Sequence, residues 1–138
     1  MTGSDFLFDT SAVIDLFKGN PVVASKLGTI TTIKIPSIVL GELYFGVYRS
    51  SNPQKHINQV KQFVENCEVL AIDVNTAEVY ATIKNKLKIK GKPIPENDIW
   101  IAAIAIQFDL LLVAFDKHFL EIDGLKLEEW KLKLPIGI

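Results

Sequence analysis

The sequence predicts an α/β protein, a three-layer sandwich in which helices flank a mainly parallel central sheet. Short apolar runs alternate along the chain with longer segments of helical periodicity, and this alternation is typical of parallel sheets with crossover helices. The chain has 138 residues, with 49% hydrophobic and 22% charged side chains. Such a composition excludes a disordered chain and indicates a single domain over residues 1–138.

The first predicted unit is a strand followed by a helix. The apolar run Phe6–Phe8 reads as a strand and ends at Asp9. Thr10 and Ser11 follow, and their hydroxyl groups can cap a helix that runs to about Phe17. An acidic residue is therefore expected at the carboxyl end of the first strand.

The next segments repeat this alternation. Gly and Pro at 19–21 end one helix and open another, which runs to about Leu27. The β-branched run Thr31–Ile35 predicts a second strand. A helix is then expected from Ser37 to Tyr48, because its apolar residues recur at helical spacing.

The second half of the chain continues in the same order. Asn52 and Pro53 open a helix to about Asn66, Val69–Ile72 reads as a strand, and a long helix follows at Asn75–Ile89. Two prolines and a glycine make residues 90–95 a loop. The last elements are expected to be a helix, a strand, a helical turn and an edge strand at Asn97–Ile106, Leu110–Phe115, Lys117–Leu120 and Leu125–Leu127.

Charge and cysteine content indicate which partners and which cellular compartment to expect. A formal net charge of -1 gives no overall basic field for nucleic acid, so a polyanionic partner would need a local patch. The single Cys67 fits a reducing compartment, since it has no internal disulfide partner. Neither a signal peptide nor an apolar run of spanning length is present. We therefore expect a cytoplasmic protein without a membrane partner.

Four acidic residues stand at the ends of predicted elements. Asp9 and Asp116 directly follow apolar strands, and the carboxyl ends of parallel strands face a common crevice. Glu42 and Asp98 lie on the inward sides of helices near their starts. Carboxylates about 4 Å apart repel by roughly 4 kcal/mol per pair at an effective dielectric near 20. Their convergence therefore requires a cation or altered protonation.

Mg²⁺ or Mn²⁺ would satisfy this requirement, because hard divalent ions take oxygen ligands and keep water that can act as a nucleophile. Phosphodiester hydrolysis is the chemistry that such a site suits. Each acid also has a structural interpretation when it is taken alone. Asp98 and Asp9 can cap helices, and Asp116 can belong to a turn. Glu42 is the hardest to explain structurally, since it interrupts an apolar face.

Other polar and aromatic residues allow more than one interpretation. Lys84, Lys88 and Lys117 could bind nucleic-acid phosphates, although lysines near the end of a helix often only interact with solvent. His118, close to Asp116, could have a catalytic role, but a surface or capping position is the favoured interpretation. Candidate contacts for dimerisation follow Glu42 in the sequence: Tyr44, Phe45, Val47 and Tyr48.

Four sequence blocks carry a resemblance to a known family. They are DTSA at 9–12, PSIVLGELYFG at 36–46, NDIWIAA at 97–103 and LLVAFDKHF at 111–119. In this order they resemble the PIN-domain ribonucleases, specifically the VapC-type toxins of toxin–antitoxin modules. The match spans Phe6 to about Leu127, and four blocks in the right order are far more specific than DTSA alone.

The resemblance implies a PIN-like fold and a metal-dependent endoribonuclease. It implies that Asp9, Glu42, Asp98 and Asp116 form the acidic Mg²⁺ or Mn²⁺ site, with Ser11 and Asn97 in supporting positions. It also implies an RNA substrate, a homodimer and a VapB-like antitoxin whose C-terminal segment obstructs the site. The sequence departs from the family at Ala114, where relatives commonly carry Thr or Ser. This departure removes a hydroxyl group but none of the four carboxylates.

Two other functions remain open at the level of the sequence. One is a catalytically idle domain that keeps the fold for dimerisation and antitoxin binding, and Ala114 is its one motivating feature. The other is a phosphotransfer or phosphatase-like α/β domain, which also places an Asp after the first strand. This last function fits less well, because Asp9 is not followed by a second acid two residues later and no separate phosphate loop is present.

Overall fold

The computed structural model describes residues 6–19 and 33–129. In this part of the chain, five strands form one sheet in the order β3-β2-β1-β4-β5, and every pairing is parallel. The strands are β1 (Phe6–Phe8), β2 (Ile33–Pro36), β3 (Cys67–Leu70), β4 (Leu111–Val113) and β5 (Leu127–Glu128). The predicted parallel sheet is confirmed.

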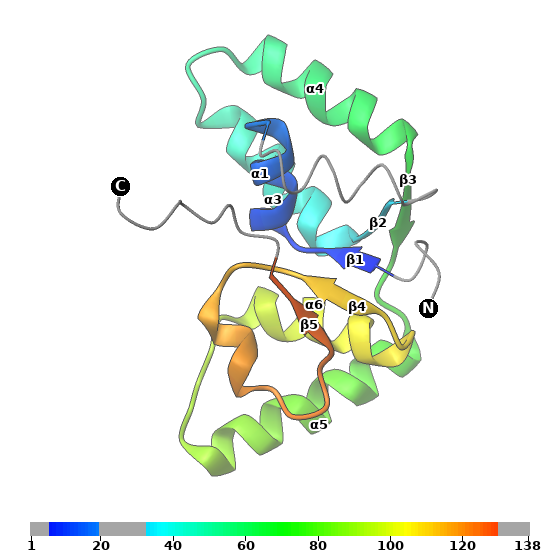
Figure 1. Cartoon of the computed structure of the whole chain (residues 1–138), viewed down its shortest axis with the longest axis vertical. Coiled ribbons are helices and arrows are strands. Elements are labelled where there is room, and N and C mark those ends of the chain that lie inside the picture. Colours follow the sequence, from blue (N-terminus) through cyan, green and yellow to red (C-terminus); the bar gives the residue numbers. More distant parts are fainter. Residues whose placement is uncertain (1–5, 20–32, 130–138) are drawn as a thin grey trace, which may run out of the picture.

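Helices cover both faces of this sheet. The helices are α1 (Thr10–Phe17), α3 (Ser37–Tyr48), α4 (Pro53–Glu65), α5 (Val74–Lys90) and α6 (Glu96–Gln107), and a 3-10 turn, η2, spans Lys117–Glu121. Figure 1 shows α1, α3 and α4 on one side of the sheet and α5 and α6 on the other. This division follows from right-handed crossovers, because the chain moves outward from β1 to β3 and then returns past β1 to β4.

The strand order reverses between β1 and β4. Residues Phe6, Leu7 and Phe8 pair with Leu111, Leu112 and Val113, so the carboxyl ends of these two strands lie side by side. In open parallel sheets the crevice at such a reversal is where ligands bind. The topology therefore gives one edge of the molecule the geometry of a binding site.

Helix α1 begins at Thr10, as the sequence predicts, but its cap differs from the prediction. The Asp9 carboxylate accepts a hydrogen bond from the Ala12 amide at 2.9 Å. The Ser11 hydroxyl instead donates to the Asp9 carboxylate. The prediction that the hydroxyl groups cap this helix is therefore wrong, because the carboxylate of Asp9 satisfies the free amide and the hydroxyl serves the carboxylate.

Helices α3, α4 and α5 agree closely with the predicted segments. Asn52 caps α4 by accepting from the Lys55 amide, and Asp73 and Thr76 form a capping box at the start of α5. The helix predicted at residues 21–27 lies outside the described residues, as do the first two residues of the strand predicted at Thr31–Ile35.

The edge strands β3 and β5 are shifted from their predicted positions. β3 starts two residues before the predicted Val69–Ile72, because α4 ends at Glu65 with Asn66 as its C-cap, and Cys67 then pairs at once with Ile33. β5 starts two residues after the start of the predicted Leu125–Leu127, where pairing with Leu112 first becomes available. Both strands lie at edges of the sheet, where partial exposure weakens the apolar pattern.

β4 is shorter than the predicted Leu110–Phe115. Asp109 adopts a left-handed backbone with φ 52°, and the Leu110 amide donates to the Ala105 carbonyl at 2.8 Å. Leu110 is therefore part of the helix C-terminal cap, and the strand begins one residue later.

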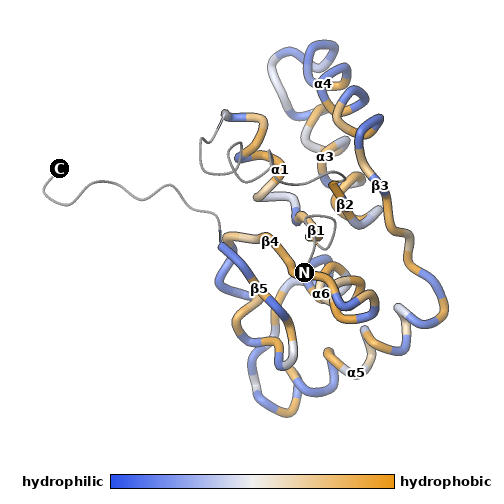
Figure 2. Tube along the Cα trace, turned by 45° about the vertical axis from the view of Figure 1, so that its right-hand side comes forward, coloured by the Kyte–Doolittle hydropathy of each residue, from blue (hydrophilic) through white to orange (hydrophobic). Residues whose placement is uncertain are grey.

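The core lies between the sheet and the helices on its two faces. α6 is buried from Ile101 to Ala105, and Figure 2 shows apolar residues along α6 and the central strands. The largest side chains with almost no exposure include Phe8, Phe119, Leu7 and Ile35. Each such side chain contributes about 1.5–3 kcal/mol through burial. Among the described residues, no helix has the length and apolarity needed to cross a membrane.

Candidate metal centre

Asp9 lies at the carboxyl end of β1, where the strand order reverses. Its side chain is 4% exposed, and its backbone amide donates to the Val113 carbonyl of β4 at 3.1 Å. Ser11 donates from its hydroxyl to the two carboxylate oxygens of Asp9, at 2.8 Å and 3.0 Å. The same hydroxyl accepts a bond from the Phe115 amide at 3.4 Å. Ser11 therefore connects Asp9 to the end of β4.

Burial raises the pKa of Asp9 to about 6. The Ala12 amide and the Ser11 hydroxyl act in the opposite direction, because they stabilise the ionised carboxylate, while the charges of Asp98 and Glu42 raise the pKa further. Asp9 is thus a buried carboxylate whose ionisation is opposed by its surroundings and by two nearby acids.

Asp98 belongs to the first turn of α6, and its side chain is 18% exposed. Burial raises the pKa of this carboxyl group, a hydrogen bond from His118 lowers it, and the charges of Asp116 and Glu42 raise it. The sequence suggested helix capping as an alternative role, but Pro95 is the N-cap residue of α6 and its backbone carbonyl accepts from the Asp98 amide. The Asp98 side chain faces other acids instead.

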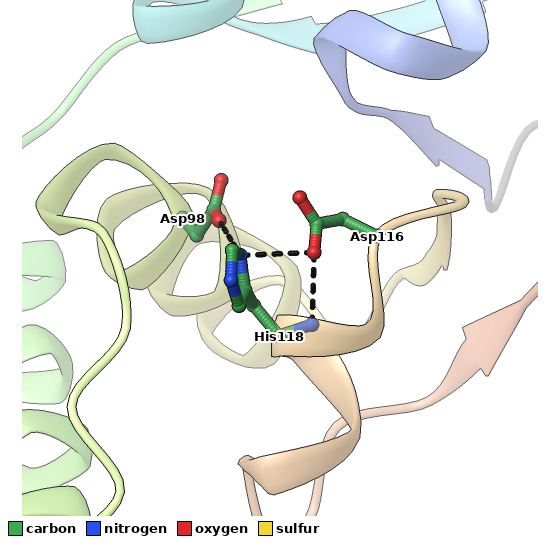
Figure 3. A group of neighbouring side chains, drawn as sticks. All are labelled: Asp98, Asp116 and His118. Carbon is green, nitrogen blue, oxygen red and sulfur yellow. Dashed lines mark hydrogen bonds and ion pairs between the residues drawn. The ribbon is translucent and has the colours of Figure 1, made fainter.

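Asp116 and His118 complete the visible cluster (Figure 3). The Nδ1 atom of His118 lies 2.9 Å from an Asp116 oxygen and 3.2 Å from an Asp98 oxygen. Asp116 also accepts a hydrogen bond from the His118 amide at 3.0 Å and so caps η2. One ligand atom from each of these three residues lies within 4.8 Å of the others, which makes this trio a possible metal-binding group.

The sequence prediction underestimated His118. Its interpretation as a surface or capping residue missed the contact with Asp98, which lies 20 positions earlier in the chain. The available signal was the Asp-x-His spacing directly after a buried strand. A short turn there brings a histidine back over the end of the strand.

Glu42 extends from the middle of α3 towards the same region. Its Oε1 atom accepts a hydrogen bond from the Thr10 hydroxyl at 2.7 Å, and its charge raises the pKa of both Asp9 and Asp98. Thr10, which was not predicted as a site residue, therefore fixes the Glu42 carboxylate. Among the described residues, only Asp98, Asp116 and His118 bring ligand atoms within 4.8 Å of one another. Asp9 and Glu42 lie near enough for their charges to act on this group, but outside that distance.

The remaining candidates occupy different surroundings. Asn97 is exposed and lines an open groove of about 750 Å³ together with Thr10, Glu42, Phe45 and Arg49. This groove adjoins the acidic cluster through Thr10 and Glu42. Arg49 lies over the Phe45 ring, 5.7 Å from its centroid.

The predicted RNA-binding lysines are not gathered in this groove. Lys84 is paired with Glu96 and also bonds to Tyr80, and it lines a separate pocket of about 280 Å³ with Lys88. Lys117 is exposed and directly follows Asp116.

The acidic cluster lacks a basic counterpart in the described residues. Over residues 6–19 and 33–129, no lysine or arginine lies within ion-pair distance of Asp9, Glu42, Asp98 or Asp116, and His118 is the one basic side chain that does. Hard oxygen ligands that repel one another fit a divalent cation such as Mg²⁺ or Mn²⁺. The donor set therefore fits the predicted metal.

Comparison with known proteins agrees with this geometry. The sequence pattern of the PIN domain matches residues 6–125. The chain is 31% identical over 128 residues to Ribonuclease VapC2 of Haemophilus influenzae, a match that covers 91% of this chain and 97% of that protein. It is 30% identical over 128 residues to the tRNA(fMet)-specific endonuclease VapC of Salmonella typhimurium, with the same coverage.

Solved structures share the fold. The chain superposes on a chain of DNA-bound VapBC from Salmonella typhimurium with a TM-score of 0.87 and 28% identity, covering 95% of this chain and 100% of that one. For VapBC2 from Rickettsia felis bound to a DNA fragment from their promoter, the TM-score is 0.85 with 28% identity, covering 91% and 98%. The reversal of strand order and the positions of the acids agree with this match. Because the family pattern covers most of the sequence, the chain belongs to the PIN domain family.

Proposed function

We propose that this protein is a metal-dependent endoribonuclease and the toxin of a toxin–antitoxin system. The observation that carries the proposal is the convergence of Asp9, Glu42, Asp98 and Asp116 at the reversal of strand order, without a lysine or arginine partner in the described residues. The names of the relatives support the reaction class, since they are called ribonucleases and a tRNA-specific endonuclease.

Asp9, Asp98 and Asp116 would hold the ion, with Glu42 as the fourth carboxylate of the site. When bound, Mg²⁺ or Mn²⁺ supplies charge that stabilises the transition state of phosphodiester hydrolysis and lowers the pKa of a coordinated water molecule. Asp9 must be ionised to take part, and the Ser11 and Ala12 hydrogen bonds favour that state. Thr10 holds one oxygen of Glu42, so this carboxylate is oriented to accept a proton from water that approaches along the groove.

The RNA backbone would enter through the groove that Arg49 and Asn97 line. Arg49 is the single arginine of the chain, and a guanidinium group suits bidentate contact with phosphate. Lys117 is exposed and directly follows Asp116 in the sequence, so it can contact an RNA phosphate next to that acid. Lys84 is the weakest of the predicted RNA contacts, because Glu96 already neutralises it, and Lys88 lies beside the same separate pocket.

Partners are proposed from the relatives. Three of the similar solved structures are VapBC complexes, two of them bound to DNA, so we infer a VapB-like antitoxin for this chain. A homodimer is proposed on the family resemblance, with Phe45 and Tyr48 as contacts because they are 62% and 77% exposed. Val47 is only 4% exposed and packs in the core, so its prediction as a dimer contact is wrong. An RNA substrate and a DNA-bound partner indicate the cytoplasm.

A catalytically idle domain is the second candidate. Ala114 favours it, because the hydroxyl that relatives commonly carry at this position is absent. In the structure Ala114 is 2% exposed and its amide donates to the Glu128 carbonyl at 3.2 Å. The neighbouring Phe115 amide donates to the Ser11 hydroxyl, so a hydroxyl group is still present at the end of β4. We therefore prefer the active enzyme.

The direct test uses Asp9→Asn and Asp98→Asn. Both variants should lose at least about 100-fold of the rate of RNA cleavage in Mg²⁺ or Mn²⁺, because loss of a single stabilising group in an active site commonly costs that much. Expression of either variant should no longer arrest growth. Asp109→Asn is the matched control, since Asp109 is exposed, pairs with Lys126 and has a left-handed backbone that Asn tolerates.

Two outcomes would separate the candidates. Unchanged cleavage by both site variants would refute the assignment of the site. If the wild-type protein binds neither Mn²⁺ nor Mg²⁺ in calorimetry and does not cleave RNA, the idle domain becomes the better description.

A further inference from the structure

His118 is held between two of the proposed metal ligands. Its Nδ1 atom contacts both Asp98 and Asp116. Figure 3 shows the imidazole ring and the two carboxylates pointing towards one another from the start of α6, from η2 and from the residue that caps η2. The cap of η2 needs only the backbone amide of His118. Capping therefore does not explain why the imidazole ring turns towards Asp98.

The distances between these atoms suit neighbouring ligands of one ion. Two ligands at adjacent corners of an octahedron with bonds of about 2.1 Å lie about 3 Å apart. The Nδ1 atom lies 2.9 Å and 3.2 Å from the two carboxylate oxygens. The same arrangement also serves as an ion pair between an imidazolium and two carboxylates, so an experiment must distinguish a ligand from a counter-ion.

We propose that His118 is a nitrogen ligand of the bound ion and that it makes the site prefer Mn²⁺ to Mg²⁺. This inference rests on the metal site of the proposed function. Mg²⁺ strongly prefers oxygen ligands, whereas imidazole nitrogen binds more tightly to metals later in the divalent series, in which Mn²⁺ already accepts it. A site of carboxylates alone would lack this source of selectivity.

The first experiment detects the nitrogen directly. Full-length protein is loaded with Mn²⁺ at pH 8 and examined by electron spin echo spectroscopy for modulation from ¹⁴N. The wild-type protein should show coupling to an imidazole nitrogen, and His118→Gln should lose it. His56→Gln is the matched control and should keep it, because His56 lines a different pocket and is the other of the two histidines in the chain.

The second experiment measures selectivity by calorimetry with Mn²⁺ and Mg²⁺. Loss of an outer-shell partner already costs about 10–100-fold in metal affinity, so His118→Gln should weaken Mn²⁺ binding at least about tenfold. Mg²⁺ binding should change much less, and the Mn²⁺ preference should shrink. Thermal unfolding in EDTA checks that the variant is folded.

Several results would overturn this inference. They are Mn²⁺ binding by the wild-type protein without ¹⁴N modulation, modulation that persists in His118→Gln, an unchanged Mn²⁺ preference, or no Mn²⁺ binding at all. RNA cleavage by the same preparations is measured separately. Cleavage that persists without nitrogen ligation would reject the role of His118 and leave the nuclease assignment intact. Nitrogen ligation without cleavage would support the role of His118 and reject the nuclease assignment.

Discussion

Asp9 caps α1 and is also proposed to hold the metal ion, and these two roles have different energetic requirements. As the cap of α1 it accepts a hydrogen bond from Ala12, which a neutral amide side chain would also do. As a site acid it must be ionised although it is buried beside Asp98 and Glu42. This residue therefore stabilises the helix in either protonation state, but only its charged form can bind a cation.

The raised pKa of Asp9 predicts a pH-dependent loss of stability. Its pKa rises from 3.8 to about 6 on folding. Between these values the folded protein keeps a proton that the unfolded chain has lost, so the free energy of unfolding falls as pH rises through this window. In metal-free buffer, the loss for this one group amounts to at most about 3 kcal/mol, at 1.36 kcal/mol for each unit.

Asp9→Asn should therefore be more stable than the wild-type protein at pH 8 in EDTA and about equally stable at pH 3. Mn²⁺ should raise the melting temperature of the wild-type protein and not that of the variant. Thermal unfolding across pH, with Glu78→Gln as an exposed control on α5, measures both effects. If the variant is less stable than the wild-type protein at pH 8 in EDTA, the ionised Asp9 carboxylate does not destabilise the fold and the prediction is wrong.

At the scale of elements, the ends of the helices decide where the acids lie. Helix α5 ends at Gly91, which has φ 69°, and the Lys92 amide donates back to the Leu87 carbonyl at 3.0 Å. The chain then turns through the prolines to start α6, whose first turn carries Asp98. The left-handed cap at Gly91 thus sets the approach of α6 to the sheet.

Gly91→Ala should lower the free energy of unfolding by about 1 kcal/mol, because a Cβ atom disfavours positive φ. Gly41→Ala gives the opposite sign as a control. Gly41 lies inside α3 with no atom within 4 Å of an added Cβ, so alanine should stabilise the helix by about 0.5–1 kcal/mol. Urea unfolding in EDTA compares the two variants. Equal effects would show that the conformation of the cap does not matter.

At the scale of the whole molecule, charge is distributed unevenly although the net charge is only -1. Acids converge at the end of β1 and β4, and the groove beside them carries Arg49. In the described residues, Arg49 has no carboxylate within ion-pair distance, and its guanidinium group lies over the Phe45 ring. A polyanion that approaches the acidic centre would therefore depend on such local cationic positions.

Arg49→Ala should weaken binding of RNA and reduce the slope of log affinity against log salt by about 0.7–0.9, as expected for the loss of one phosphate contact. Binding of a 20-nucleotide oligouridylate is measured in EDTA to prevent cleavage. Lys55→Ala on α4, an exposed residue away from the groove, should leave the slope unchanged. Equal slopes for wild type and Arg49→Ala would show that the RNA takes another path.

Local patterns in the sequence predicted most of the fold. The positions of β1, α1, α3 and α5 follow from apolar periodicity and from capping or turn residues, because these act over a few neighbouring positions. The edge strands β3 and β5 were shifted by two residues, since their limits depend on which partner strand is available. We propose, on the same basis, that the 138 residues form one domain.

The sequence by itself determined which residues are acidic at the ends of elements, and its motifs indicated that four of them belong together. Only the tertiary structure decided which atoms meet. It placed His118 against Asp98 and fixed Glu42 through a hydrogen bond from Thr10. It also paired Lys84 with Glu96 in an ion pair. Periodicity reports the burial of neighbouring residues, whereas these contacts join distant segments and depend on how the strands are ordered in the sheet.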